Sequence, residues 1–456
     1  MHPVRVLALD HFFDQDLRSL EAVPQLDVRR FPYQRLRRRA LRILGDSVGR
    51  GLVAYNDPAL AHARARYAAS LAREVQRLYL EKPFDVMVLP SDTFFYVRTL
   101  PAAVHRLGVP VVVVQKETTI SRATMETFSR EVGAAAPFIS DFMTVCSERQ
   151  REFWIRAGAD PDLIDVTGQP RFDVYATATK PLLSTPRRVL FLTYALDAYV
   201  PGAGRGDGSL VWQALRSETE TALFDQVRAG ACELVVKCHP QQDRAAEARH
   251  LEAMAGALWN HGITLAAQDA DTRDVIMSAD VVVGFQTTAL YEAVAARRDV
   301  IYAAWGDAYE RYRAGLIPFD SAPPGCVRHA ASPEELRASL TSPPPPALSG
   351  CEAWYAVALG VIDGRGADRV ATRLAAIAAS WNPTDLRSDL DRRRRRFAVG
   401  LLARSAAAEA VWTAALPAAG LTGQRHRVAT RRRRARDDRR IATRTLTNRD
   451  VSRGEG

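Results

Sequence analysis

The chain has 456 residues, 47% of them hydrophobic, and a formal net charge of +10. This length suits two domains plus an extension, and the composition is that of a globular protein, which excludes a single small core and a wholly disordered chain. The charge is local, because residues 385–456 hold 19 arginines against 8 acidic residues while the rest is near neutral.

The amino-terminal segment MHPVRVLALD (1–10) enters a strand at once and lacks the basic start and longer apolar stretch of a signal peptide, so no export is expected. The five cysteines form no C-x-x-C pair, and their odd number predicts no disulfide framework. We therefore expect a protein of the reducing cytosol. The cysteines are Cys146, Cys232, Cys238, Cys326 and Cys351.

The first half alternates apolar runs with helical patterns, which predicts a parallel sheet covered by helices on both faces. The segments 58–80 and 94–107 are expected to be crossover helices, and 1–175 is expected to form one Rossmann-like domain. Ligands of such sheets lie beyond the carboxyl ends of the strands. The predicted strands are 4–10, 26–31, 84–90, 109–115, 142–147 and 163–168.

A linker at 176–186 separates this half from a second, in which the alternation restarts and predicts another Rossmann-like domain over 187–384. The Gly-rich loop 198–209 lacks G-x-G-x-x-G spacing and is expected to be a flap. The run 341–350 is another linker, and 352–379 is expected to be helical and to pack back across both halves. The predicted strands are 187–194, 232–240, 263–267, 280–285 and 299–305.

Lys237 and His239 end the second strand of this half and point to the same side, since they stand two residues apart. A cation and an imidazole donor there suit a diphosphate. The alternative is a lysine at a sheet edge and a histidine bonded to local backbone.

The segment ADVVVGFQTTALYEAVAARRDVIYAAWG (279–306) predicts a strand, a tight turn, a helix and a strand. Free N–H groups and the positive end of the helix dipole converge at this turn, which predicts an anion site at Gln286, Thr287 and Thr288. Glu292, one helical turn later, can accept hydrogen bonds from sugar or ribose hydroxyls. The alternative is that Thr288 only caps the helix and Glu292 is a solvated surface residue.

The order K-x-H-P (237–240), ADVVVGFQTT (279–288), an acid at Glu292 and a D-V-I-Y strand (299–302) resembles the second half of GT-B-fold transferases. It looks most like the CDP-glycerol glycerophosphotransferases and the bacterial surface-polysaccharide transferases that use CMP- or CDP-activated donors. The segment 139–173, ending in V-T-G-Q-P-R-F-D, is similar to the part of these families that leads into the interdomain link. The likeness covers roughly residues 80–380.

The resemblance implies an α/β fold with two doubly wound Rossmann-like domains facing across a cleft. In such a fold Lys237 and His239 would meet the donor phosphates, and Glu292 would act toward ribose or glycerol hydroxyls. This chain has Phe285-Gln286-Thr287-Thr288 where the glycerophosphotransferases usually show D-Y-S-S, so the acidic residue of that turn is missing. The other implied donor-site residues are Thr287, Thr288, Thr193, Tyr194 and, from the first domain, Arg171.

A transferase of this build also needs a general base at a strand end of the first domain, for which the candidates are His11, Asp92 and Glu117. Glu117 could instead pair with Lys116 or Arg122. No H-E-x-x-H motif, Cys cluster or Asp triad suggests a catalytic metal, so we expect a metal-independent enzyme without a cofactor.

The tail, 385–456, contains the arginine blocks 392–396 and 431–434 around an Ala-rich apolar stretch, 397–420. That stretch carries Arg404 and Glu409 and is a poor membrane span. An amphipathic helix resting on an anionic membrane and a disordered tail are both open. No interleaving of aromatic and basic residues supports binding of nucleic acid.

The sequence thus predicts a cytoplasmic transferase, peripheral on the membrane if the tail binds there. It would move a glycosyl or glycerol phosphate group from a nucleotide-activated donor to a surface-polysaccharide or teichoic-acid-like acceptor. One alternative is a UDP-N-acetylglucosamine 2-epimerase-like enzyme, although 111–120 lacks an H-V-E-A-G-type segment. The other is a non-catalytic sugar-nucleotide-binding scaffold.

Overall fold

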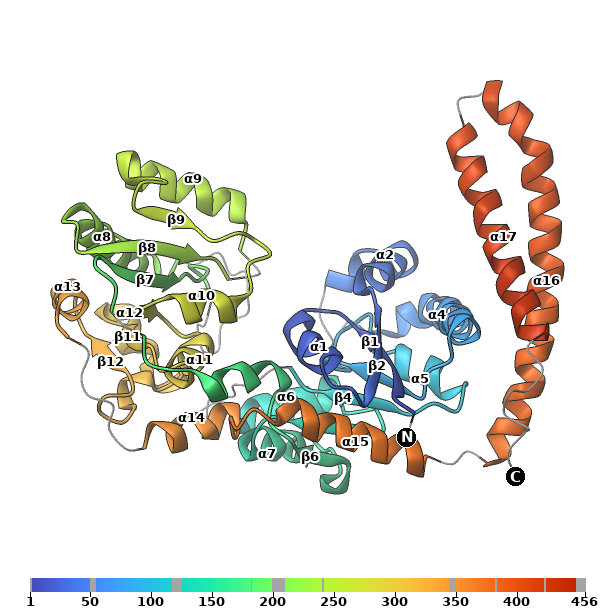
Figure 1. Ribbon diagram of the computed structural model, residues 1–456, viewed down its shortest axis with the longest axis horizontal. Helices are drawn as coiled ribbons and strands as arrows, with labels where there is room; N and C mark the ends of the chain where they lie inside the picture. Colours follow the sequence, from blue (N-terminus) through green and yellow to red (C-terminus); the bar gives the residue numbers. More distant parts are fainter. Residues whose placement is uncertain are drawn as a thin grey trace.

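The structure, a computed structural model, describes residues 2–49, 55–116, 125–181, 183–198, 210–239, 242–343, 350–381, 384–421 and 424–447. These residues form two six-stranded parallel sheets, each with its own helices. The first lies at the centre of Figure 1 and the second at the left. The predicted fold class, two doubly wound Rossmann-like domains, is confirmed.

The first sheet has the strand order β2-β1-β3-β4-β5-β6. Its central strands β3 (VMVL) and β4 (VVVV) are buried at every residue, because helices cover both faces. The order reverses between β1 and β3, which makes their carboxyl ends the expected place for a ligand. The bounds are β1 Val4–Leu9, α1 Asp14–Glu21, β2 Leu26–Phe31, α2 Tyr33–Leu44, α4 Ala61–Glu81, β3 Val86–Leu89, α5 Leu100–His105, β4 Val111–Val114, α6 Met125–Ala135, β5 Phe142–Val145, α7 Glu148–Arg156 and β6 Ile164–Val166.

The second sheet has the order β9-β8-β7-β10-β11-β12, that of a Rossmann fold, with its switch point between β7 and β10. The short 3-10 segment η4 (Pro170–Thr177) leads into it from the first domain. The bounds are β7 Arg187–Leu192, α8 Gln213–Arg228, β8 Cys232–Lys237, α9 Arg244–Ala255, β9 Ile263–Leu265, α10 Thr272–Ser278, β10 Val281–Gly284, α11 Ala289–Ala295, β11 Asp299–Ala303, α12 Gly306–Tyr312, β12 Arg328–Ala330 and α13 Pro333–Thr341.

All eleven predicted strands are present, and β12 is the one that the apolar runs do not predict. β12 has only three residues, Arg-His-Ala, and lies at the edge of the sheet, so it needs no apolar run. The crossover predicted over 94–107 is helical only in α5, because Pro101 cannot donate a backbone hydrogen bond and stands in the first helical turn.

Two return helices, α14 (Cys351–Leu359) and α15 (Gly366–Ser380), run along the base of both domains (Figure 1). The segment predicted to be helical over 352–379 is thus two helices, with a break at residues 360–365. Gly360 ends α14 with φ of 78°, a left-handed conformation that glycine adopts without strain. α14 packs on α11 and α7, whereas α15 covers one face of the first sheet with Val370, Ala371 and Leu374. The predicted packing across both halves is confirmed.

Replacement of Gly360 by Ala is expected to be severely destabilising. A Cβ there would lie 1.8 Å from the carbonyl oxygen of Cys146, a buried residue directly after β5, and backbone at such a position cannot move aside easily. We expect a loss of about 4 kcal/mol or more in the free energy of unfolding, measured by urea denaturation. Gly45→Ala is the matched control: it also has a positive φ, 63°, but nothing lies within 4 Å of its Cβ. Gly45→Ala should lower the free energy of unfolding by about 1 kcal/mol. Equal losses of unfolding free energy in the two variants would contradict the clash at Gly360.

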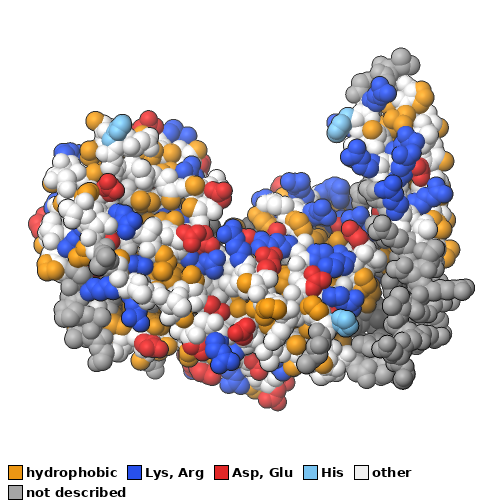
Figure 2. Space-filling model, viewed as in Figure 1, with side chains coloured by type: hydrophobic (Ala, Val, Ile, Leu, Met, Phe, Trp, Pro, Cys, Tyr) orange, Lys and Arg blue, Asp and Glu red, His pale blue; other side chains and the backbone are white. Residues whose placement is uncertain are grey.

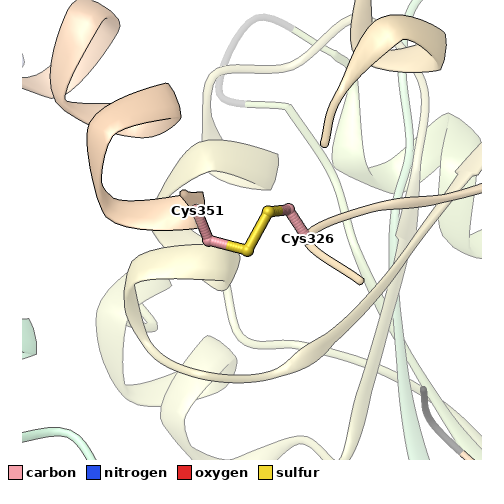
Figure 3. Close-up of a disulfide and its surroundings, with 2 residues drawn as sticks. All are labelled: Cys326 and Cys351. Atoms are coloured by element: carbon pink, nitrogen blue, oxygen red, sulfur yellow. A yellow bond between two sulfur atoms is a disulfide. The ribbon is translucent and has the colours of Figure 1, made fainter. Parts of the chain in front are cut away.

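A disulfide joins Cys326 to Cys351, which the odd cysteine count did not predict (Figure 3). The two residues are 25 apart in sequence, and they meet because α14 turns back against the second domain. The expectation of no disulfide is wrong for this pair. Cys146, Cys232 and Cys238 carry free thiols.

The tail forms a helical hairpin of α16 (Thr384–Leu421) and α17 (Arg425–Thr447), at the right of Figure 1. The two helices pack on each other, and α17 also contacts α4 of the first domain. Among the described residues, no helix is both long enough and apolar enough to span a membrane.

Candidate functional site

The strand ends of the second sheet bring the two predicted phosphate-binding segments to one edge. Gly284 of β10 pairs with Leu192 of β7, which pairs with Lys237 of β8. Two strand spacings therefore separate Lys237 from the turn after Gly284, about 10 Å between their backbones. Lys237 and the turn residues stand at the same edge of one sheet.

The three residues of the turn differ in exposure: Gln286 is buried, whereas Thr287 and Thr288 are partly exposed. Gln286, with φ of 47°, is buried, and its amide nitrogen donates to the Tyr302 hydroxyl at 2.7 Å and to the Ile317 carbonyl at 2.9 Å. It therefore fixes the segment around Ile317. The Thr287 hydroxyl accepts a hydrogen bond from the Ala289 amide at 3.3 Å, and Thr288 is the N-cap of α11 without a side-chain capping bond. Both threonines are partly exposed, as a ligand-binding role requires.

The two residues after β7 have separate surroundings. The Thr193 hydroxyl donates to the Gln242 side-chain oxygen at 2.7 Å, beside the Lys237–His239 segment. The buried Tyr194 ring packs against Phe285, with ring centroids 5.1 Å apart, and burial raises the pKa of its hydroxyl. Tyr194 thus packs in the core, and Thr193 is buried as well, with its hydroxyl bonded to Gln242.

Lys237 and His239 lie half-buried at the end of β8. Burial lowers the pKa of the Lys237 amine, while Asp271 at the start of α10 acts in the opposite direction. The His239 amide donates to the Gln242 side-chain oxygen at 2.7 Å. A lysine with a lowered pKa is less well solvated than a surface lysine, so an anion beside it gains more.

The interdomain cluster lies where the two domains meet and contains two carboxyls and two guanidinium groups. The Tyr175 hydroxyl donates to the Glu292 carboxylate at 2.9 Å, and the Gln169 amide donates to the Asp16 carboxylate at 2.8 Å. Burial raises the pKa of both carboxyls, and the positive charge of Arg171 counteracts part of each shift. The members of the cluster are Asp16, Gln169, Arg171, Tyr175, Arg273 and Glu292.

The amino-terminal end of α10 connects this cluster to the first domain. Arg273 donates to the backbone carbonyl of Arg171 at 3.3 Å, and it forms a salt bridge with Asp271 at 2.8 Å. Asp271 also accepts a hydrogen bond from Gln15 of α1 at 2.6 Å. Because Asp271 is also near Lys237, α10 links the cationic strand end to Arg171 and Glu292. Figure 2 shows the surface hollowed between the two domains.

The first-domain candidates for the general base lie in different settings. His11 is buried among Phe12, Tyr33, Phe94 and Tyr96, with three of the four ring centroids 4.5 Å from its own. The Tyr96 hydroxyl lies 2.8 Å from His11 Nε2. The ring thus stands at the carboxyl end of β1, beside the switch point.

Asp92 is fully buried and binds protein groups instead. One carboxylate oxygen accepts hydrogen bonds from the Ile139 amide at 2.9 Å and from the Ser140 amide and hydroxyl at 3.0 Å each. It therefore ties β3 to the segment before β5, and an exchange of protons with a ligand would need this packing to open. Glu117 lies outside the described residues.

Several cluster residues carried no signal that the sequence patterns detect. Asp16 and Gln15 stand in the first helix after β1, and Arg273 stands in D-T-R-D before a buried strand. These positions look like helix caps or surface charges until the two domains are docked. Tyr175 is two residues beyond the V-T-G-Q-P-R-F-D motif that drew attention to Arg171.

A cavity of about 550 Å³ lies between α8 and α9 of the second domain. Its walls include Arg216, Glu220, Glu247 and His250, which bind one another, as in the 2.7 Å contact between His250 and Glu220. Neither Lys237, Thr288 nor Glu292 lines it. In the part of the chain that the structure describes, no three His, Cys, Asp or Glu side chains are placed to hold a metal.

No model of a known protein family matches this sequence, and no curated protein does either. Solved structures are similar in fold. The UDP-GlcNAc 2-epimerase of Methanocaldococcus jannaschii has a TM-score of 0.49 and 11% identity, covering 82% of this chain and 99% of that one. The Neisseria meningitidis UDP-GlcNAc 2-epimerase bound to UDP-GlcNAc has a TM-score of 0.44 and 10% identity, covering 82% of this chain and 100% of that one. An Anabaena protein in complex with UDP-glucose has a TM-score of 0.42 and 12% identity, covering 82% of this chain and 99% of that one.

Two of these three structures are epimerases by name, which corresponds to the alternative from the sequence and not to the CDP-glycerol transferase. At TM-scores this low, the likenesses carry no conclusion about the reaction. What the chain does must be argued from its own site.

Proposed function

We propose that this protein is an enzyme that binds a nucleoside-diphosphate sugar between its two domains and acts at or next to the anomeric carbon. The observation that carries the proposal is the position of α11: the turn before it stands at the same sheet edge as Lys237, and its Glu292 accepts a hydrogen bond from Tyr175 of η4, which leads in from the first domain. The diphosphate would meet Lys237, His239, Thr287 and Thr288. Cations and backbone N–H groups stabilise a diphosphate leaving group without a metal.

Glu292 is the group of this site best suited to proton transfer. Its carboxyl is buried beside Tyr175, and its pKa is raised, which brings it nearer to the working pH of an enzyme. With a protonatable carboxyl inside the closed interface, epimerisation of the sugar is the first candidate reaction, because it needs no second substrate. A proton leaves the carbon next to the anomeric centre while the bond from the anomeric carbon to the diphosphate breaks, which leaves a double bond between the two carbons. The proton then returns from the other face as the diphosphate adds back to the anomeric carbon.

Transfer to an acceptor is the second candidate. The observation that favours it is Phe12, a residue 52% exposed beside His11, whose ring centre lies 5.3 Å from the Lys116 amine. An exposed aromatic face at a switch point is a place where an acceptor sugar could stack, and an epimerase has no need of one. Here His11 would act as the base.

The deciding experiment incubates the protein with UDP-GlcNAc in D₂O and without an acceptor. Epimerisation predicts deuterium at carbon 2 and a second UDP-sugar, both visible by proton NMR. Transfer predicts neither, but release of nucleotide once an acceptor is added. CDP-glycerol, CDP- and GDP-sugars extend the test to other donors. Thermal stabilisation without turnover would refute the enzyme and leave the sugar-nucleotide-binding scaffold, whereas neither stabilisation nor turnover with any of these compounds would refute both.

Lys237→Met is expected to weaken the binding of UDP on the order of tenfold, because it removes a half-buried cation from the diphosphate site. Isothermal titration calorimetry measures the change. Lys180→Met, which removes an exposed lysine of the linker, is the matched control and should leave the affinity unchanged. Equal affinities in both variants would place the phosphates elsewhere.

Two further expectations stay predictions. Residence in the cytoplasm is one, and the disulfide makes the redox state of the purified protein a useful first measurement. Peripheral binding of the tail to an anionic membrane is the other, and vesicle sedimentation tests it directly.

A further inference from the structure

Helix α2 presents a row of arginines that have no acidic partner. Its buried stripe, Leu36, Ala40 and Leu44, faces the core. The opposite face carries Arg35, Arg38 and Arg42, which share one side because they are spaced by three and four residues. None of these three forms an ion pair with a described residue, and the helix contains no Asp or Glu. Their charge is therefore available to a ligand.

Helix α4 lies between α2 and the hairpin and contacts both. Arg77 marks the side that faces the hairpin, since its guanidinium lies 3.7 Å from Asp438 of α17. Arg73 and Arg66, four and eleven residues earlier, fall on this same side and are exposed. They continue the basic surface from α2 toward the hairpin.

Helix α17 supplies the facing wall. Its apolar stripe, Val428, Ala435 and Ala442, is buried and recurs every seven residues, the spacing of a helix packed on one partner. Arg431 and Arg427, seven and eleven residues before Asp438, fall on the same side of α17 as Asp438 and are exposed, and the Arg431 guanidinium also packs over the Trp412 ring of α16. Figure 2 shows Lys and Arg side chains on the hairpin and on top of the first domain, with a notch between them.

We propose that this arginine notch, formed by Arg35, Arg38, Arg42, Arg66, Arg73, Arg427 and Arg431, binds a linear anionic glycan. The charges recur along two walls, so an extended chain that bears phosphate or carboxylate groups at intervals can neutralise several of them at once, with release of counterions. The proposal does not depend on the reaction at the interdomain site.

The shape and composition of the notch distinguish among polyanions. A flat bilayer would meet the outer faces of the hairpin and not the space between two walls. The large apolar side chains exposed on the described part of the hairpin are Val399 and Val411, too small to anchor it in lipid. The Arg431 guanidinium lies 4.8 Å from the centre of the Trp412 ring and covers one of its faces, which leaves less of the ring for stacking nucleic-acid bases.

The test measures binding of fluorescent poly(glycerol phosphate) and polyglucuronate chains to the full-length protein by anisotropy at several salt concentrations. One variant replaces Arg35, Arg38 and Arg42 by Gln. A second variant replaces Arg427 and Arg431 by Gln. The matched control replaces three exposed arginines outside the notch, Arg106, Arg249 and Arg311, and so removes the same charge as the first variant. Circular dichroism verifies that each variant is folded.

We expect each notch variant to lose on the order of tenfold in affinity, with a shallower salt dependence, while the control changes by less than about twofold. Equal losses in all three would show a diffuse effect of net charge and overturn the proposal. Tighter binding to vesicles rich in phosphatidylglycerol, or to single-stranded DNA of equal charge, would also overturn it and identify a membrane or a nucleic acid instead. Because the assay contains no sugar nucleotide, its failure is separate from a failure of the proposed enzyme function.

Discussion

Glu292→Gln is expected to lower kcat on the order of 100-fold and to change the affinity for UDP little. The amide keeps the shape of the side chain and can still accept the Tyr175 hydrogen bond, but it cannot exchange a proton with the sugar. Steady-state kinetics with the substrate found in the D₂O experiment measures both quantities. The separate readouts matter because the same carboxylate could instead bind a ribose hydroxyl.

Tyr175→Phe is the control for this variant, since it removes the hydrogen-bond donor but leaves the carboxyl in place. It should reduce kcat far less than Glu292→Gln. A Glu292→Gln enzyme whose KM rises while kcat stays constant would exclude proton transfer and assign hydroxyl binding to this residue.

Glu292→Gln is also expected to stabilise the fold, although it lowers activity. Burial raises the pKa of Glu292 above its ordinary value of 4.5. Between these two pKa values the unfolded state has lost the proton that the native state keeps, so native stability falls as the pH rises through this interval. Glu292→Gln should therefore raise Tm at neutral pH, and this gain should disappear as the pH falls toward 4.5. A stabilisation that persists at low pH would contradict the burial of an ionised carboxylate.

Reduction of the Cys326–Cys351 disulfide is expected to lower Tm by several degrees. The bond closes a loop across 25 residues, and in the chain-entropy account such a loop is worth about 3 kcal/mol. For a domain of about 200 residues this corresponds to roughly 6 to 12 °C. Differential scanning calorimetry with and without a phosphine reductant measures the shift.

The control for reduction is the double variant Cys326→Ser, Cys351→Ser, which should melt at the lower temperature and should not respond to the reductant.

The packing of α14 suggests that the disulfide also supports the site. The Trp354 ring lies 4.6 Å from that of Tyr291, which immediately precedes Glu292 on α11. If the bond braces the site through α14, reduced protein will also lose turnover. Unchanged turnover would limit the bond to stability.

The predicted site residues divide according to what surrounds them. Lys237, Arg171 and Glu292 are brought toward one interdomain region, as the motifs suggested. Gln286, Tyr194 and Asp92 bind or pack against protein groups. A motif records that a polar residue follows a strand, but whether its hydrogen bonds go to a ligand or to a neighbouring loop depends on segments that are distant in the sequence.

The sequence by itself determined the local structure: the apolar runs of β-branched residues, broken by Gly, Pro and helical segments, specify eleven strands and their parallel pairing. It also identified the strand ends where a ligand can lie, because side-chain periodicity and backbone stops are short-range effects. Only the tertiary structure decided that Gln15 meets Asp271, that Cys326 meets Cys351, and that the basic tail folds back as a hairpin against α4. These contacts join residues far apart along the chain, and burial and docking, which no local pattern records, set both their partners and the pKa of Glu292.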